Sequence, residues 1–169
     1  MSMNTYLLTW NPQKWRWTDL ADLIGQISRE GSCVTEWSCG NNKSIAEGER
    51  LFLLRQGEEP RGIVGAGWAG SVPFEAVHWR AEKAAAGRTT MYVRVGWEVL
   101  LDPEAESIFP REWLNEPPLS RVNWNTQISG IRIRPEAAEA LEERWAAFLK
   151  GRRRGFSLFS GSAPDEAVD

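Results

Sequence analysis

The chain has 169 residues, of which 42% are hydrophobic and 25% are charged, so it is long enough to fold as one domain around its own core. Its formal net charge of −3 argues against binding nucleic acid through overall charge, although a local basic patch can still do so. No apolar run approaches the roughly 20 residues that a membrane-spanning helix needs, so no membrane partner is expected.

The start of the chain and its cysteines favour a cytoplasmic protein. The sequence MSMNTYLLTWNPQKW lacks the basic segment, apolar segment and small-residue cleavage site of a signal peptide. Cys33 and Cys39 form no C-x-x-C motif, and His78 is the only histidine. We therefore favour reduced thiols over a disulfide, and we expect no bound metal and no other cofactor.

The first half of the chain predicts strands around one early helix. Residues 4–9 form an apolar run that is typical of a strand. Apolar residues then recur at helical spacing over 19–29, after Thr18 as a plausible N-cap. Residues 50–55 and 61–68 are two further apolar runs bounded by glycines, and they predict a hairpin.

The second half adds a long strand, a short strand and a final helix. Residues 90–97 alternate between apolar and polar side chains, and 99–101 either extend that strand or begin another. Residues 111–115 predict one helical turn and 130–134 a short strand. Pro135 then begins a helix that is expected to end near residue 149.

This order predicts an α+β protein, with a mixed or antiparallel sheet that curls into a small barrel and is flanked by a few helices. Residues 1–150 are expected to form the single domain. Periodicity stops beyond Gly151, so residues 151–169 are expected to be a flexible tail or a linker.

Ten tryptophans exceed what a core of this size needs, so some should be exposed, lie in an interface or line a pocket. Trp17, Trp97 and Trp145 lie on periodic faces and are predicted to be core residues. Trp37 lies in TEWSCGNNKSI (35–45), among small and polar residues, which predicts a loop. Its ring would either pack under that loop or bind a flat ligand.

Motifs for catalysis are weak. His78 has no accompanying nucleophile motif, and residues 75–83 lack the spacing of a metal-dependent nuclease site. The glycines of RGIVGAG are not followed by G-K-[ST] and a helix, as a phosphate-binding loop requires. We therefore expect a binding protein and not an enzyme, with a nuclease as the remaining alternative.

The residue types favour recognition of a nucleobase. A base held in a protein pocket needs flat apolar faces and a few hydrogen-bonding groups for its edge. Stacking on an aromatic ring contributes about 1–3 kcal/mol per base, and flipping a base out of a duplex costs a few kcal/mol. One stack therefore roughly offsets the flip, and contacts with the base edge and the phosphates must supply the net affinity.

Four stretches in order, at 6–17 (YLLTWNPQKWRW), 37–57 (WSCGNNKSIAEGERLFLLRQG), 60–67 (PRGIVGAG) and 123–133 (NWNTQISGIRI), resemble the EVE domain. This domain is a member of the PUA-like superfamily, which also contains the YTH and ASCH domains. The similarity is greatest to EVE modules that precede HNH nuclease domains in bacterial modification-dependent restriction enzymes. The resemblance implies a PUA-like pseudobarrel with a pocket for one flipped, modified base.

The resemblance also implies a ligand and its binding residues. The expected partner is double-stranded DNA that carries 5-methylcytosine or 5-hydroxymethylcytosine, read by a stand-alone protein or by the specificity module of a restriction system. A nuclease domain or subunit is a further implied partner. The alternative ligand is RNA with a methylated nucleotide, as in YTH domains. By position, the base-binding residues are Trp37, Ser38, Trp79, Trp10 and Asn11. Independently of the resemblance, the basic side chains that could contact the phosphates of the nucleic-acid backbone are those of Lys14, Lys43, Arg61, Arg88, Arg132 and Arg134.

Overall fold

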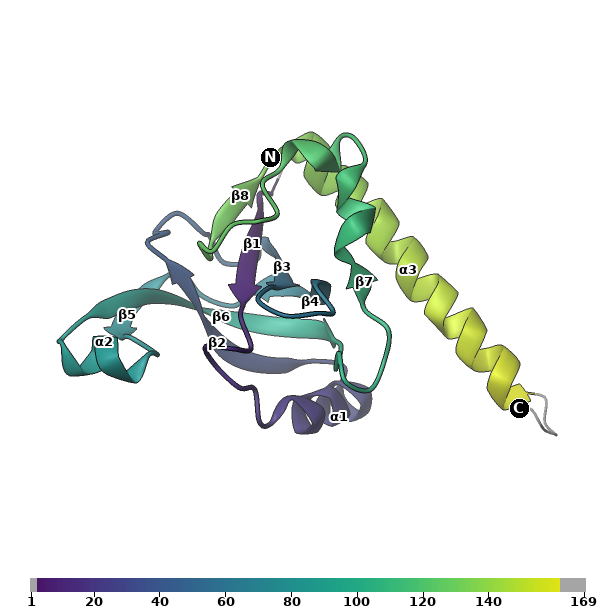
Figure 1. Ribbon diagram of the computed structural model, residues 1–169, viewed down its shortest axis with the longest axis horizontal. Helices are drawn as coiled ribbons and strands as arrows, with labels where there is room; N and C mark the ends of the chain where they lie inside the picture. Colours follow the sequence, from purple (N-terminus) through teal and green to yellow (C-terminus); the bar gives the residue numbers. More distant parts are fainter. Residues whose placement is uncertain (1–2, 162–169) are drawn as a thin grey trace.

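The computed structural model describes residues 3–161 of the chain, and the side chains of residues 3–152 (Figure 1). Within that range the chain forms one mixed sheet with helices around it. In chain order the elements are β1 (Thr5–Trp10), α1 (Leu20–Glu30), β2 (Cys33–Gly40), β3 (Arg50–Arg55), β4 (Gly62–Ala69), β5 (Phe74–Val77), α2 (Ala81–Ala85), β6 (Thr89–Leu100), β7 (Phe109–Pro110), the 3-10 helices η1 (Arg111–Asn115) and η2 (Leu119–Arg121), β8 (Ile131–Ile133) and α3 (Pro135–Gly161).

The sheet runs in the order β2-β6-β4-β3-β1-β8, with β5 paired to β6 and β7 paired to β4. The β1–β3 pair is parallel and the other pairs are antiparallel. The expectation of an α+β chain with one mixed sheet is therefore confirmed. Figure 1 shows α3 along one side of the sheet, and β5, α2 and the start of β6 projecting on the other side as an arm.

The sheet is not closed into a complete barrel: its edge strands are β2 and β8, and β2 pairs with neither β8 nor β1. Side chains bridge the gap between β2 and the end of β1 instead. The indole nitrogen of Trp37 donates to the carbonyl oxygen of Thr9 at 3.0 Å. The hydroxyl of Ser129 donates to the carbonyl oxygen of Ser38 at 2.7 Å and accepts from the backbone N–H of Thr9 at 3.1 Å. We call this bridged gap between β1 and β2 the seam.

Most predicted elements lie close to their expected positions. The strand predicted at 50–55 has those bounds, and its hairpin partner is shifted by one residue. The strand predicted at 90–97 continues to Leu100, so Val99 and Leu100 extend it and Leu101 lies just beyond its end. Gly31, with φ 89°, ends the first helix in the left-handed conformation that glycine adopts most readily.

The end of the chain differs from the expectation. The last helix, α3, continues to Gly161 instead of ending near residue 149. Part of the segment expected to be a flexible tail or linker, residues 162–169, lies outside the described residues.

The prediction that Trp37 lies in a loop was wrong, because Trp37 lies within strand β2. That strand pairs with β6 from Cys33 to Gly40, so the backbone groups on one of its edges are hydrogen-bonded to the neighbouring strand. Cys33, Trp37 and Cys39 are buried on one face of it, and Val34, Glu36 and Ser38 alternate with them on the more exposed face. Small polar residues are typical of loops, and the sequence of this segment does not show that it pairs with the long strand β6.

Two of the three tryptophans predicted to be core residues are deeply buried. Trp97 is buried inside the sheet, and Trp145 of α3 packs edge-on against Phe52 of β3, with the ring centroids 5.9 Å apart. Trp17 is only partly buried. Both cysteines are buried and free, and burial raises the pKa of the Cys39 thiol to about 11. Among residues 3–161, no helix has both the length and the apolar content needed to cross a bilayer.

Candidate functional site

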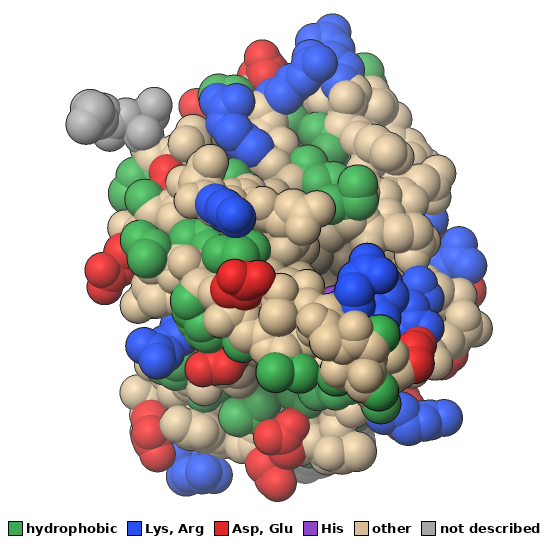
Figure 2. All heavy atoms as spheres, turned by 90° about the vertical axis from the view of Figure 1, so that its left-hand side faces the viewer, with side chains coloured by type: hydrophobic (Ala, Val, Ile, Leu, Met, Phe, Trp, Pro, Cys, Tyr) green, Lys and Arg blue, Asp and Glu red, His purple; other side chains and the backbone are tan. Residues whose placement is uncertain are grey.

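A pocket of about 430 Å³ opens at the seam, and we call it the seam pocket. It is lined by four parts of the chain: the end of β1 with the turn after it, strand β2, the arm, and the loop that precedes β8. Figure 2 shows a hollow on this face of the molecule with Lys and Arg side chains beside it. The pocket lies where the sheet fails to close, so side chains and not strand pairing define its walls.

The seam pocket brings together all five predicted base-binding residues. Trp10 and Asn11 come from the end of β1, Trp37 and Ser38 from β2, and Trp79 from the arm. Of the six predicted backbone-contact residues, only Lys14 is among those lining it.

Trp37 forms part of the pocket wall and is at the same time a core residue. Only 9% of its surface is exposed, and its indole N–H is bound to Thr9. Its ring lies 4.8 Å from that of Trp17 and makes edge contacts with Trp15 and Trp97 at 5.4 and 6.3 Å. We call Trp10, Trp15, Trp17, Trp37 and Trp97 the tryptophan cluster. Trp37 therefore offers a ligand only a small part of its ring.

Two other tryptophans present far more ring surface to the pocket. Trp79 is 40% exposed and Trp15 is 39% exposed. The imidazole of His78 stacks on Trp79 at 5.3 Å with an interplanar angle of 29°, which restricts the orientation of the Trp79 ring. Trp79 and Trp15 are therefore the tryptophans at the pocket with the most exposed surface, and His78 supports one face of the Trp79 ring.

A hydrogen bond fixes the tautomer of the neutral His78 ring. Its Nδ1 accepts the backbone N–H of Arg80 at 3.0 Å, so the neutral ring carries its proton on Nε2. Burial lowers the pKa of His78, and the positive charges of Lys83, Arg80 and Arg88 lower it further. His78 is thus a neutral support for Trp79 near neutral pH.

Hydrogen-bonding groups at the pocket are already partly occupied. The hydroxyl of Thr90 donates to the carbonyl oxygen of Gly40, so the Ser38 hydroxyl is the donor in the 3.2 Å contact between Ser38 and Thr90. Ser38 also accepts from the N–H of Gly40 at 3.3 Å, which leaves it as an acceptor for one more partner. The Oδ1 of Asn11 accepts the backbone N–H of Gln13 at 2.9 Å. The Nδ2 of Asn11 has two N–H groups that could donate hydrogen bonds to a ligand.

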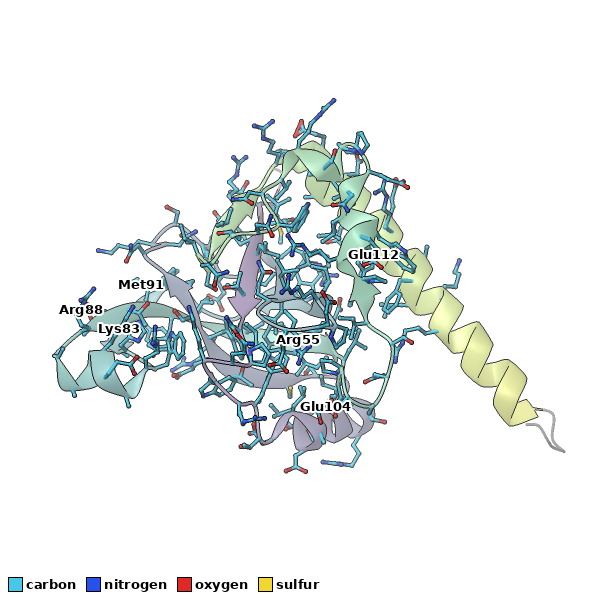
Figure 3. The ribbon with its side chains drawn as sticks, in the orientation of Figure 1. Arg55, Lys83, Arg88, Met91, Glu104 and Glu112 are labelled. Atoms are coloured by element: carbon cyan, nitrogen blue, oxygen red, sulfur yellow. The ribbon has the colours of Figure 1, made fainter. Side chains whose placement is uncertain are left out.

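The rim of the seam pocket is basic although the whole chain is acidic. Lys14, Arg80 and Lys83 line it together with one carboxylate, Glu36, and Arg80 also forms a salt bridge with Glu82 at 2.5 Å. Arg88 lies on the arm close to Lys83 (Figure 3), and its carbonyl oxygen accepts the backbone N–H of His78 at 3.1 Å. The local charge is therefore suited to an anionic partner.

The remaining predicted backbone-contact residues lie apart from this rim. Arg61 is at the turn between β3 and β4, 3.7 Å from the carboxylate of Glu59. Arg132 donates to Asn4 at 3.2 Å, and Lys43 and Arg134 do not line the pocket either. The sequence reasoning did not assign several lining residues, among them Trp15, His78, Arg80, Lys83, Tyr92, Gln127 and Ile128. The sequence HWRAEK (78–83) could have indicated the basic rim, because it places Arg80 and Lys83 close to Trp79.

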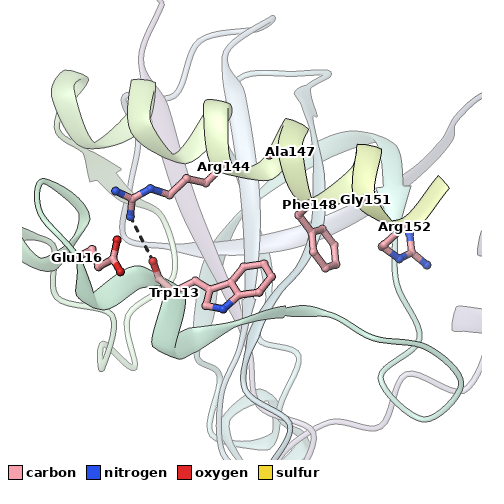
Figure 4. Close-up of a pocket in the computed structure, with 7 residues that line it drawn as sticks. All are labelled: Trp113, Glu116, Arg144, Ala147, Phe148, Gly151 and Arg152. Carbon is pink, nitrogen blue, oxygen red and sulfur yellow. Dashed lines mark hydrogen bonds between the residues drawn. The ribbon is translucent and has the colours of Figure 1, made fainter. Parts of the chain in front are cut away.

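A second hollow, of about 540 Å³, lies between η1 and α3 (Figure 4), and we call it the helix groove. Its walls are formed mainly by Trp113, Ala147 and Phe148. Arg144 donates to the carbonyl oxygen of Trp113 at 3.3 Å and so holds η1 against the helix. Within the described part of the chain, no group of three or more His, Cys, Asp or Glu side chains could hold a metal ion.

Comparisons with known proteins show similarity of fold alone. No family model matches the sequence, and no curated protein matches it either. A hypothetical protein from Leishmania major superposes with a TM-score of 0.58 at 13% identity, over 85% of this chain and 94% of that one. A protein from Pseudomonas syringae gives 0.53 at 18% identity, over 88% and 99% of the two chains, and one from Pseudomonas putida gives 0.52 at 13%, over 82% and 97%.

Proposed function

We propose that this protein is a non-enzymatic reader of modified cytosine in double-stranded DNA, and that the flipped base enters the seam pocket. The modification is 5-methylcytosine or 5-hydroxymethylcytosine. The reader acts alone or as the specificity module of a restriction system that contains a nuclease domain or subunit. The fold assignment within this proposal is a PUA-like pseudobarrel of the EVE type.

The observation that carries the proposal is the convergence of five residues on one pocket. The sequence alone predicts base contacts for Trp10, Asn11, Trp37, Ser38 and Trp79, which come from three separate stretches of the chain and all line this pocket. The volume of about 430 Å³ lies within the roughly 300–1,000 Å³ of typical small-ligand pockets. The curled sheet with its unpaired seam is also compatible with a pseudobarrel.

Each part of the pocket has a role in this proposal. Trp79 provides the stacking face, and Trp10 and Trp37 form the apolar wall behind the base. Asn11 and Ser38 contact the base edge as donor and acceptor respectively. Lys14, Arg80 and Lys83 contact the phosphates that flank the flipped nucleotide, which supplies the salt-dependent share of the affinity.

The test is a fluorescence-anisotropy titration at fixed salt concentration, since phosphate contacts make the affinity depend on salt. The duplexes are identical except for one cytosine, which is plain, 5-methyl or 5-hydroxymethyl, and an RNA with a methylated nucleotide serves as competitor. We expect the protein to bind one of the modified duplexes more tightly than the plain duplex.

Equal affinity for all three duplexes, with efficient competition by the RNA, would overturn the DNA proposal in favour of the RNA reader. The same duplexes incubated with Mg²⁺ test the enzyme alternative. Cleavage of the modified duplex by this chain alone would contradict a purely non-enzymatic role.

A further inference from the structure

The loop that precedes β8 carries an exposed apolar side chain at the seam pocket. Ile128 lines the pocket and is 65% exposed. Single exposed apolar residues are common on protein surfaces, and Val34, which is 64% exposed and does not line the pocket, is an example in this chain. Ile128 differs from Val34 because it lines the pocket to which the proposed function assigns the flipped base.

The loop that holds Ile128 is anchored by hydrogen bonds from Gln56. Gln56 is buried, and its side-chain amide donates to the carbonyl oxygens of Trp124 and Thr126, both at 2.8 Å. The backbone N–H of Gln56 donates to the carbonyl oxygen of Trp10 at 2.7 Å, so one residue ties this loop to the end of β1. The loop therefore has a fixed position relative to the pocket wall.

The residues next to Ile128 are fixed as well. The Thr126 hydroxyl, which is buried, accepts the backbone N–H of Ile128 at 3.0 Å. Ser129 bridges the seam through Thr9 and Ser38, and the N–H of Gly130 donates to the carbonyl oxygen of Leu7 at 2.8 Å. An exposed isoleucine on a backbone bound on both sides is a stiff apolar projection and not a flexible tip.

We propose that Ile128 is a wedge that enters the duplex where the modified cytosine leaves the stack. Flipping a base opens a gap between neighbouring base pairs, and proteins that distort duplexes insert apolar side chains such as Ile between base steps. A wedge must be stiff and must lie beside the pocket that receives the base, and Ile128 meets both conditions. This inference rests on the proposed function and specifies its substrate as a base-paired duplex.

The wedge acts only on a stacked duplex, so removing it should change the ratio of duplex affinity to single-strand affinity. A single strand has no paired partner to displace, and its bases can enter the pocket without a wedge. Replacing Ile128 by Ala should therefore weaken duplex binding while leaving single-strand binding nearly unchanged. A side chain that merely touches the ligand would affect both to a similar extent.

The experiment compares Ile128→Ala, Ile128→Leu and the matched control Val34→Ala with the wild type. Each protein is titrated with a duplex and with the corresponding single strand, with plain and with 5-methylated cytosine. We expect Ile128→Ala to bind the duplexes about tenfold more weakly and the single strands within about twofold of the wild type. Ile128→Leu should retain duplex binding because it keeps an apolar wedge, and Val34→Ala should match the wild type.

The outcomes separate the wedge from the function on which it rests. If the wild type does not prefer methylated DNA, the proposed function fails. The loss of duplex affinity in Ile128→Ala, compared with its loss of single-strand affinity, still tests whether Ile128 acts as a wedge. Equal losses for duplex and single strand, or no loss with either, would overturn the wedge. Preferential binding of a single strand or of RNA by the wild type would overturn it too.

Discussion

The seam pocket and the helix groove are both aromatic hollows, but they are built differently. The helix groove is the larger, at about 540 Å³ against about 430 Å³, and Trp113, Ala147 and Phe148 form most of its walls. The seam pocket combines exposed Trp79 with the polar side chains of Asn11 and Ser38 and a basic rim. Size and a more uniformly apolar lining would favour the helix groove, whereas a ligand that is flat, polar at its edge and anionic favours the seam pocket.

The difference follows from where each hollow lies in the fold. The helix groove forms between α3 and η1, whose backbone groups are largely bonded within the helices, so mainly side chains face it. The seam pocket forms where β1 and β2 fail to pair, so hydroxyl, amide and indole groups must bridge the gap. An unclosed sheet thus concentrates polar groups beside buried tryptophans.

The first test of this comparison removes one tryptophan from each hollow and measures stability. Trp37→Ala should lower the free energy of unfolding by about 3–5 kcal/mol, because it empties a buried site and leaves the Thr9 carbonyl oxygen without its indole donor. Trp113→Ala should cost about 1 kcal/mol, because Trp113 is 48% exposed.

Urea unfolding of both variants measures the two losses. Similar losses would show that Trp37 is not the core residue described above. A large loss in Trp37→Ala would also mean that this variant cannot test base binding cleanly, since poor folding alone would reduce binding.

The second test uses the same contrast for ligand binding. Trp79→Ala should weaken binding of modified DNA by about 1–3 kcal/mol, the usual contribution of one base stack, while changing stability little. Trp113→Ala is the matched control, because it removes an exposed tryptophan from the helix groove and should leave DNA binding unchanged. If the control weakens binding as much as Trp79→Ala does, the two hollows cannot be distinguished by function.

The sequence predicted the elements whose signal is local. The apolar run at 50–55 and the alternation at 90–97 define β3 and most of β6, because a strand buried on one or both faces leaves such a pattern in its own residues. Strand β2 was missed because its burial depends on pairing with β6. The length of α3 was underestimated because the helix continues where the apolar periodicity fades.

The pocket shows the same limit. The resemblance selected Trp37 and Trp79, but the sequence could not show which ring is open to a ligand, since that depends on the tryptophan cluster packed around Trp37. It also could not identify Ile128, whose importance comes from the anchoring of its loop to Gln56. Exposure and stiffness are properties of the assembled fold.

The third test concerns the charge that distinguishes the two hollows. Lys83→Ala removes one cation from the rim of the seam pocket. If Lys83 contacts one phosphate, the slope of log K against log salt concentration should become shallower by about 0.9. Lys43→Ala removes an equal charge from an exposed lysine that does not line the pocket, and it should leave the slope unchanged. Anisotropy titrations at several salt concentrations give both slopes, and equal slopes in the two variants would contradict a role for the rim.

The smallest expected effect is on the protonation of His78. Burial and the charges of Lys83, Arg80 and Arg88 lower its pKa from the ordinary 6.5, so the folded protein binds a proton less readily than the unfolded chain does. The contribution of His78 to stability is therefore fully present above about pH 6.5 and is lost as the pH falls through the lowered pKa. Lys83→Ala should raise the pKa of His78 toward 6.5, whereas Lys43→Ala should not change it.

Because His78 is the only histidine, its ring protons can be followed without ambiguity in an NMR titration. A pKa at or above 6.5 in the wild type would mean that the basic rim does not act on the ring that supports Trp79. A lowered pKa that rises in Lys83→Ala would show that the rim and the stacking face form one electrostatic unit. That coupling would distinguish the seam pocket from the helix groove, which has no histidine among its described lining residues.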